Sequence, residues 1–138
     1  MSSTTKRAGG AYHARYSYEV DPECAYCGEP SQGRDHIPPL RFAGSELDLP
    51  RGARWMLVGA CRECNSILGA RPLLTLGARR TFLIERYTKR YGKLIDCPAW
   101  NMDEIMELGR GLQTAVMVQE AERRRAIRRM RRLKERAP

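Results

Sequence analysis

The chain has 138 residues, of which 42% are hydrophobic and 30% charged, and its formal net charge is +9. This composition is typical of one compact globular domain with extensions, and it excludes an intrinsically disordered chain. No apolar run approaches the roughly 18 residues of a membrane span, and residues 1–10 lack the apolar core of a signal peptide. We therefore expect a cytoplasmic protein without a membrane partner, in which paired cysteines hold metal more often than they form disulfides.

The first part of the chain, residues 1–20, predicts an N-terminal arm. The aromatic side chains of this arm, Tyr12, Tyr16 and Tyr18, are expected to pack back on the domain. His13 is expected to lie on the surface or to pack against the domain. A tight turn follows at residues 24–28, because a glycine at Gly28 permits a positive φ angle.

Four of the five cysteines stand in two Cys-x-x-Cys pairs, Cys24/Cys27 and Cys61/Cys64. Each pair supplies two corners of a tetrahedron, so together they predict the four thiolate ligands of a structural zinc site. The interval between the pairs exceeds the roughly 15 to 20 residues of an ordinary zinc ribbon, so further structure is folded into it. The alternative is four free or redox-active thiols, but a redox Cys-x-x-Cys usually accompanies a βαβ pattern, which is missing here.

Most of the interval between the two cysteine pairs predicts a loop between two short strands. Residues 29–56 are rich in Pro, Gly and charge, and the Pro38-Pro39 pair forbids a helix directly after His36. An apolar run of strand length follows at residues 55–60. Residues 62–68 then predict one to two helical turns that end at Gly69.

The remainder of the chain predicts helices. One helix is expected over residues 76–91, ending at Gly92, and a second over residues 102–134, beginning with a capping box at Asn101 and Glu104. The first half of the second helix carries an apolar stripe that should pack against the first helix, although two glycines weaken it: Ile105, Leu108, Leu112, Ala115 and Val116, with Gly109 and Gly111. The fifth cysteine, Cys97, has no nearby partner and is expected to be a small buried hydrophobe.

Eight of the net nine positive charges lie in residues 123–136. A segment with so large an excess of positive charge favours a polyanionic partner, DNA or RNA, because binding phosphates relieves the repulsion between its own charges. The alternatives are a solvated helix face, an anionic membrane surface or an acidic protein. Apolar residues recur every three positions within the run, at Ile127, Met130 and Leu133, which predicts an amphipathic helix and also allows a homodimer contact. The predicted phosphate contacts in this run are Arg123, Arg124, Arg125, Arg128, Arg129, Arg131 and Arg132.

The central motifs carry a family resemblance. Cys24-x-x-Cys27-Gly, Asp35-His36-Ile37-Pro38-Pro39 and Leu57 to Asn65, which ends in Cys-Arg-Glu-Cys-Asn, resemble the zinc-bearing HNH nucleases and the endonuclease VII-type resolvases of phages. The resemblance covers roughly a third of the chain, about residues 24–69. It implies the ββα-metal fold, DNA as substrate, and a phage-encoded protein that acts in the bacterial cytoplasm.

The resemblance also implies roles for Asp35, His36 and Asn65. Asp35 and Asn65 match the positions that bind one divalent ion, Mg²⁺ or Mn²⁺, for which carboxylate and amide oxygens are suitable ligands. His36 matches the general base that removes a proton from the attacking water. Arg34 and Arg62 lie beside these residues in the sequence and are candidate phosphate contacts.

From these patterns we expect an α+β protein: an arm over 1–20, a ββα-metal core over 21–72, a helical extension over 73–122 and a basic helix over 123–138. The leading hypothesis is a metal-dependent HNH-type endonuclease that nicks DNA or cleaves branched DNA. The alternative is a non-catalytic zinc module that binds DNA or RNA, since no counterpart of the middle HNH asparagine occurs between His36 and Cys64. In that case His36 is a structural residue or a zinc ligand, and Asn65 caps or bridges the turn. A third hypothesis is an adaptor that docks on an acidic partner.

Overall fold

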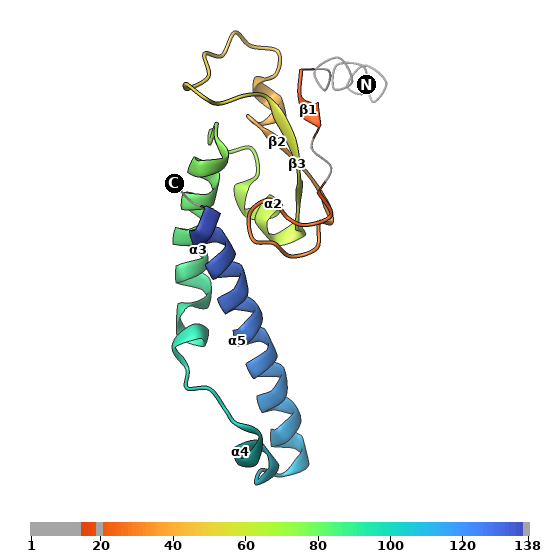
Figure 1. The fold of residues 1–138 in the computed structure, drawn as a ribbon, viewed down its shortest axis with the longest axis vertical. Coiled ribbons are helices and arrows are strands. Elements are labelled where there is room, and N and C mark those ends of the chain that lie inside the picture. The colour runs from red at the N-terminus through yellow and green to blue at the C-terminus, as the bar shows by residue number, and fades with distance from the viewer. Residues whose placement is uncertain (1–14, 19–20, 137–138) are drawn as a thin grey trace.

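The computed structural model describes residues 15–18 and 21–136, so the predictions for Tyr12 and His13 lie outside the described residues. As expected, the fold is α+β, with a small sheet, a four-cysteine cluster and a long last helix (Figure 1). The elements in chain order are β1 (Ser17–Tyr18), β2 (Gly33–Ile37), the short 3-10 helix η1 (Leu40–Phe42), β3 (Met56–Ala60), α2 (Arg62–Leu68), α3 (Leu76–Asp96), α4 (Met102–Met106) and α5 (Arg110–Arg136).

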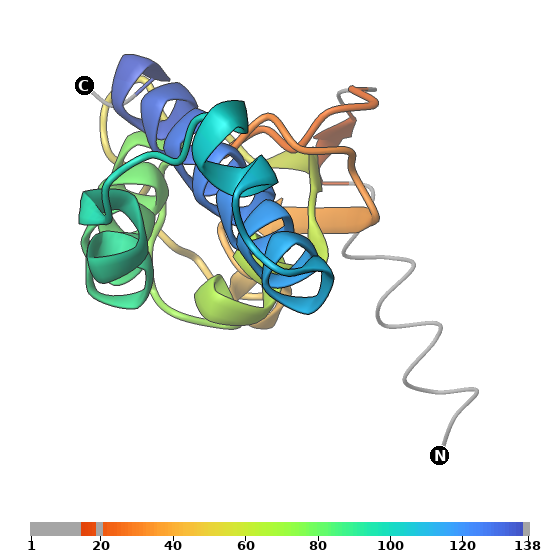
Figure 2. The same cartoon turned by 90° about the horizontal axis from the view of Figure 1, so that it is seen from below.

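The sheet has the strand order β1-β3-β2. Strand β2 runs antiparallel to β3, with Gly33 opposite Ala60 and Ile37 opposite Met56, and β1 runs parallel to β3. All five residues of β3 are buried, because the helices cover one face and a small apolar cluster around Tyr16 covers part of the other. Figure 2 shows the helices gathered on one side of the sheet. The sequence predicted neither β1 nor the position of β2 within the loop of residues 29–56.

Helices α2 and α3 cover the inner face of the sheet. Helix α2 ends at Gly69 with a φ of 50°, as predicted. Helix α3 begins after Thr75, whose hydroxyl accepts a hydrogen bond from the Ala78 amide, and it continues through Gly92 to Asp96. The predicted end at Gly92 is therefore wrong, because this glycine keeps helical geometry and the chain leaves the helix only before Pro98.

The last predicted helix is two helices. The capping box of Asn101 and Glu104 is confirmed and begins α4, but this helix stops at Met106. A break over residues 107–109 precedes α5, and Gly109 lies in it. A glycine there costs a continuous helix about 1 kcal/mol relative to alanine, so the chain turns here instead of extending.

The packing of α5 differs in part from the sequence-based expectation. Of the predicted stripe, Ile105 and Val116 are buried and Leu108 is half-buried, but Leu112 is 60% exposed and Ala115 is also exposed. None of these five residues belongs to the core cluster that contains Leu83 and Tyr87 of α3, whereas Met130 and Leu133 of the arginine-rich half do. The prediction of an amphipathic basic helix is thereby confirmed. None of the helices in the described part of the chain is both long and apolar enough to cross a membrane.

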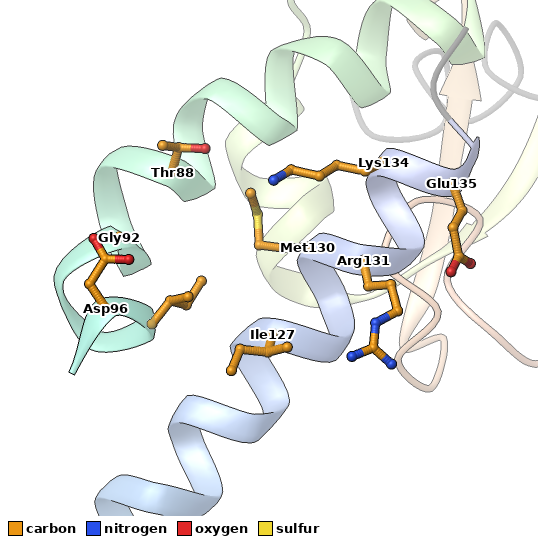
Figure 3. A pocket seen from close by; sticks show the side chains of 9 residues that line it. Thr88, Gly92, Asp96, Ile127, Met130, Arg131, Lys134 and Glu135 are labelled. Carbon is orange, nitrogen blue, oxygen red and sulfur yellow. The ribbon is translucent and has the colours of Figure 1, made fainter. Parts of the chain in front are cut away.

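A hollow of about 610 Å³ lies between α3 and α5 (Figure 3). Met130 and Lys134 extend from α5 toward α3, and Ile95 and Ile127 make the lining partly apolar. The aliphatic stem of a lysine can cover apolar surface while its ammonium group stays in water. The basic half of α5 thus packs through its apolar side chains and lysine stem, although nine of its last fourteen described residues are Arg or Lys.

Candidate metal centre and the predicted catalytic residues

The four paired cysteines come together as predicted. Their sulfur atoms all lie within 4.8 Å of one another and all four residues are buried, and Cys27 Sγ is 3.6 Å from Cys61 Sγ. Zn–S bonds of about 2.3 Å at tetrahedral angles separate two sulfurs by about 3.8 Å. The cluster can therefore hold a structural metal such as zinc without rearrangement of the backbone.

Local structure positions each cysteine pair. In the first, the Gly28 amide donates to the Cys24 carbonyl at 3.0 Å, and Gly28 has the predicted positive φ of 77°. In the second, Cys61 ends strand β3 and caps helix α2, so that its sulfur accepts a hydrogen bond from the Cys64 amide at 3.4 Å. A turn and a helix start thus present two sulfurs each toward the same point.

Hydrogen bonds among the four thiols shift their pKa values in opposite directions. They lower the pKa of Cys27 to about 6 and also lower that of Cys61, whereas they raise the pKa of Cys24 and of Cys64. A zinc ion with four thiolates carries a net charge of −2, and the guanidinium of Arg129 lies 3.7 Å from Cys61 Sγ and 3.9 Å from Cys64 Sγ. Arg129 therefore supplies a positive charge beside the sulfurs.

Arg129 was predicted to contact nucleic acid, but its side chain is only 5% exposed. It donates to Tyr87 Oη at 2.8 Å and is ion-paired with Glu63. Burial alone would raise the pKa of Glu63, but hydrogen bonds from Tyr91, Arg129 and Arg90 outweigh it and hold that pKa below its usual value. The pair therefore contributes its full stability above the ordinary glutamate pKa, and this stability is lost as the pH falls from that value through the lowered pKa of the folded protein.

Asp35 is not open to a metal ion. Its carboxylate is 4% exposed and forms a bidentate ion pair with Arg79, which is fully buried, with Nη2 at 2.7 Å and 3.0 Å and Nε at 3.0 Å. Tyr26 Oη also donates to it, because burial raises the pKa of this tyrosine well above its usual value and keeps the hydroxyl protonated. Arg79 Nη1 donates to the Leu73 carbonyl at 2.9 Å, so every nitrogen of the guanidinium is engaged.

His36 projects from the opposite face of β2. Successive residues of a strand alternate between faces, and the Asp35 side chain points toward α3. The His36 ring is half-buried and packs edge-on against Tyr16, with ring centroids 5.0 Å apart, on the face away from the helices. The structure therefore separates the predicted base from the predicted metal ligand.

Asn65 lies on α2, beside the inner face of β2. Its Nδ2 atom donates to the Arg34 carbonyl at 3.3 Å and lies close to Gly33, which is on the same face of the strand as Asp35. Within the described part of the chain, no hydrogen bond joins Asn65 to Asp35. Asn65 and Asp35 thus share one side of β2, His36 lies on the other, and Asn65 here links a helix to a strand.

The predicted phosphate contacts fall into several groups. Arg34 stacks over the Tyr18 ring at 4.5 Å, and Arg62 is exposed at the start of α2. Four arginines of α5 form ion pairs with acidic side chains of this chain: Arg123 and Arg124 with Glu120, Arg125 with Glu29, and Arg132 with Glu23. Arg128 and Arg131 are exposed and have no side-chain partner among residues 15–18 and 21–136.

The sequence did not predict the partners of Asp35, which are Tyr26 and Arg79. It also did not predict the partners of Arg129, which are Glu63 and Tyr87. One signal was present for Arg79, which stands between Leu76 and Leu83 at helical spacing and so occupies a position that faces the core. Cys97 also differs from its prediction, since it is half-buried and its thiol donates to the Lys93 carbonyl at 3.2 Å.

The chain was compared with known proteins. No family model, no curated protein and no solved structure matches it. Its function is therefore inferred from its own geometry and chemistry.

Proposed function

We propose that this protein is a nucleic-acid-binding module built on a four-cysteine zinc centre, with the ββα-metal arrangement of the HNH family. The antiparallel pair β2 and β3 followed by α2, with one cysteine pair before β2 and the other at the junction of β3 and α2, supports this arrangement. The closed ion pair between Asp35 and Arg79 is the observation that favours binding over catalysis.

That ion pair occupies the carboxylate that a catalytic metal would need. A divalent cation would have to displace a buried guanidinium that engages both oxygens of Asp35. Breaking a buried pair leaves an uncompensated charge and typically costs about 3 to 5 kcal/mol. Mg²⁺ also loses its own hydration reluctantly, so the exchange is unfavourable.

Binding, by contrast, needs only exposed positive charge. Arg128 and Arg131 on α5, with Arg62 at the start of α2, offer such charge on the described surface. Contacts of this kind act on phosphates without reading sequence. They supply three of the positive charges behind the net charge of +9.

The test is the salt dependence of binding to a short DNA duplex, measured by fluorescence anisotropy. In the double variant Arg128→Gln and Arg131→Gln, we expect weaker binding and a slope of log K against log salt that is shallower by about 2, since each lost phosphate contact removes about 0.9. The matched control removes two exposed charges from α3, Arg86→Gln and Lys89→Gln. Equal slopes for both double variants would show that the α5 surface is not the contact.

The second candidate is the HNH-type endonuclease that the sequence suggests, acting on DNA with Mg²⁺ or Mn²⁺. One observation favours it: Asp35 and Asn65 lie on the same side of β2, where α2 packs. A metal ion there would polarise the phosphate, and His36 would take a proton from water. This activity requires Arg79 to leave Asp35.

Plasmid nicking separates the two candidates. With Mg²⁺ or Mn²⁺ present, we expect wild-type protein and His36→Ala to produce the same background of nicked plasmid, with DNA binding intact in both. His36 is half-buried, so thermal unfolding of the variant is measured in parallel. Metal-dependent nicking by the wild type that disappears in a folded His36→Ala protein would overturn the binding-only function in favour of the nuclease.

A further inference from the structure

The face of the sheet away from the helices carries a small hollow near Gly59. Its volume is about 300 Å³, and its lining includes Tyr18, Ser31, Arg34 and Gly59. We call it the Gly59 hollow. Gly59 contributes bare backbone, and a Cβ atom there would lie 2.7 Å from the Asp21 carbonyl and 2.8 Å from Ser31 Oγ, so no side chain can fill this position. The glycine therefore allows Asp21 and Ser31, which also line the hollow, to pack directly against β3.

An aromatic ring and a guanidinium stand at this hollow. Tyr18 is 50% exposed, and the guanidinium of Arg34 lies over its ring at 4.5 Å. Because Arg34 is opposite Gly59 in the ladder, its side chain can cross the glycine to reach Tyr18 on β1. The stack leaves aromatic and cationic surface accessible at the same point.

A second stack of the same kind lies on the other side of His36. Arg15 lies 4.2 Å from the centroid of Trp55, and Tyr16 packs edge-on against both Trp55 and His36. Arg34 and His36 are two residues apart on one strand face, a spacing of about 7 Å. The face thus carries two arginine–aromatic pairs: Arg34 on β2 with Tyr18 on β1, and Arg15 before β1 with Trp55 before β3.

Resting on the proposed function, we propose that this face binds single-stranded nucleic acid by stacking an unpaired base at the Tyr18–Arg34 pair. Proteins that bind single strands combine cationic groups for the backbone with exposed rings on which bases stack. A purely electrostatic contact with a duplex gains no binding energy from exposed aromatic rings, because the paired bases are already stacked on one another. The chemistry at the Gly59 hollow therefore selects a strand with unpaired bases, as in a gap, a flap or a branch.

The test compares a single-stranded oligonucleotide with a duplex of equal length by fluorescence anisotropy. We expect Tyr18→Leu to weaken single-strand binding by about tenfold, within the range of one lost base stack, and to leave duplex binding unchanged. Tyr18→Phe should retain single-strand affinity because it keeps the ring. Arg34→Gln should weaken single-strand binding more than Arg86→Gln, a control that removes one charge from an arginine–aromatic pair on α3.

A measurement on the wild-type protein keeps the inference testable if a variant is unstable. Photocrosslinking of a 5-iododeoxyuridine oligonucleotide should label the peptide that contains Tyr18. Labelling confined to other peptides, or equal loss of single-strand and duplex affinity in a folded Tyr18→Leu protein, would overturn the inference. In the first case duplex binding through Arg128 and Arg131 would still stand. In the second case the Arg128→Gln and Arg131→Gln variant decides it separately, so failure of this inference is distinct from failure of the proposed function.

Discussion

Replacing Cys64 with serine is expected to abolish cooperative folding. Binding of a structural zinc ion contributes about 10 to 16 kcal/mol in small zinc domains, as much as the entire stability of a typical domain. The sulfurs are also part of the hydrophobic core that includes Leu83 and Leu133, so losing the metal site disrupts packing as well as coordination. Zinc content by elemental analysis and thermal unfolding by near-UV circular dichroism measure the effect.

The control for this variant is Cys97→Ser, which removes a cysteine outside the cluster. It should keep one bound zinc per chain and an unchanged unfolding transition. Chelation of the wild-type protein should reproduce the Cys64→Ser result, and more readily as the pH falls, because protons compete with the metal for the thiolates. A wild-type protein that unfolds cooperatively at the same temperature without metal would contradict a structural role for zinc.

Replacing Arg79 with methionine is expected to destabilise the protein by about 3 to 5 kcal/mol, because it leaves the buried carboxylate of Asp35 without a positive partner. The effect is measured as the free energy of unfolding in urea. The matched control is Arg86→Met on the same helix, which is exposed and should change stability by less than about 0.5 kcal/mol. Equal stability of the two variants would show that the ion pair contributes nothing to the fold.

The same variant also tests the function of Asp35. If Asp35 serves only the fold, Asp35→Asn in combination with Arg79→Met should recover part of the lost stability, since the uncompensated charge is gone. Millimolar Mg²⁺ or Mn²⁺ should not stabilise Arg79→Met more than Arg86→Met. Selective stabilisation by these ions would mean that the freed carboxylate accepts a metal, and it would favour the nuclease.

The basic helix has two functions in this fold. Its inner side supplies Arg129 to the cysteine cluster and Arg136 to the Cys24 and Ala25 carbonyls, so part of the positive charge holds the first cysteine turn and the metal site. Its outer side leaves Arg128 and Arg131 exposed. A run of arginines in a sequence therefore does not by itself measure how much charge is available to a partner.

Local chemistry explains which features could be predicted. The thiol spacing, the positive φ of Gly28, the end of α2 at Gly69 and the capping box of Asn101 each depend on residues within five positions of one another. Secondary structure and the spacing within each Cys-x-x-Cys pair are set at this range, so the sequence alone determined the two cysteine turns and most helices. The meeting of the two turns, with Cys27 and Cys61 separated by 34 positions, was expected because structural zinc takes four ligands. The sequence also placed β3 and α2, while the cysteine pairs, the Asp35-His36 motif and Asn65 carried the HNH resemblance.

Only the tertiary structure decided what these elements do together. The pairs Asp35–Arg79 and Cys61–Arg129 join residues 44 and 68 positions apart. Among the 25 basic residues, the sequence marks Arg79 only by its core-facing position in α3, and nothing in it marks Arg129 or the partner of either arginine. Their selection follows from how α3 and α5 pack on the sheet, which excludes water and makes an unpaired charge costly. For the same reason the alternation of β2 separates His36 from Asp35, although the two are adjacent in the sequence.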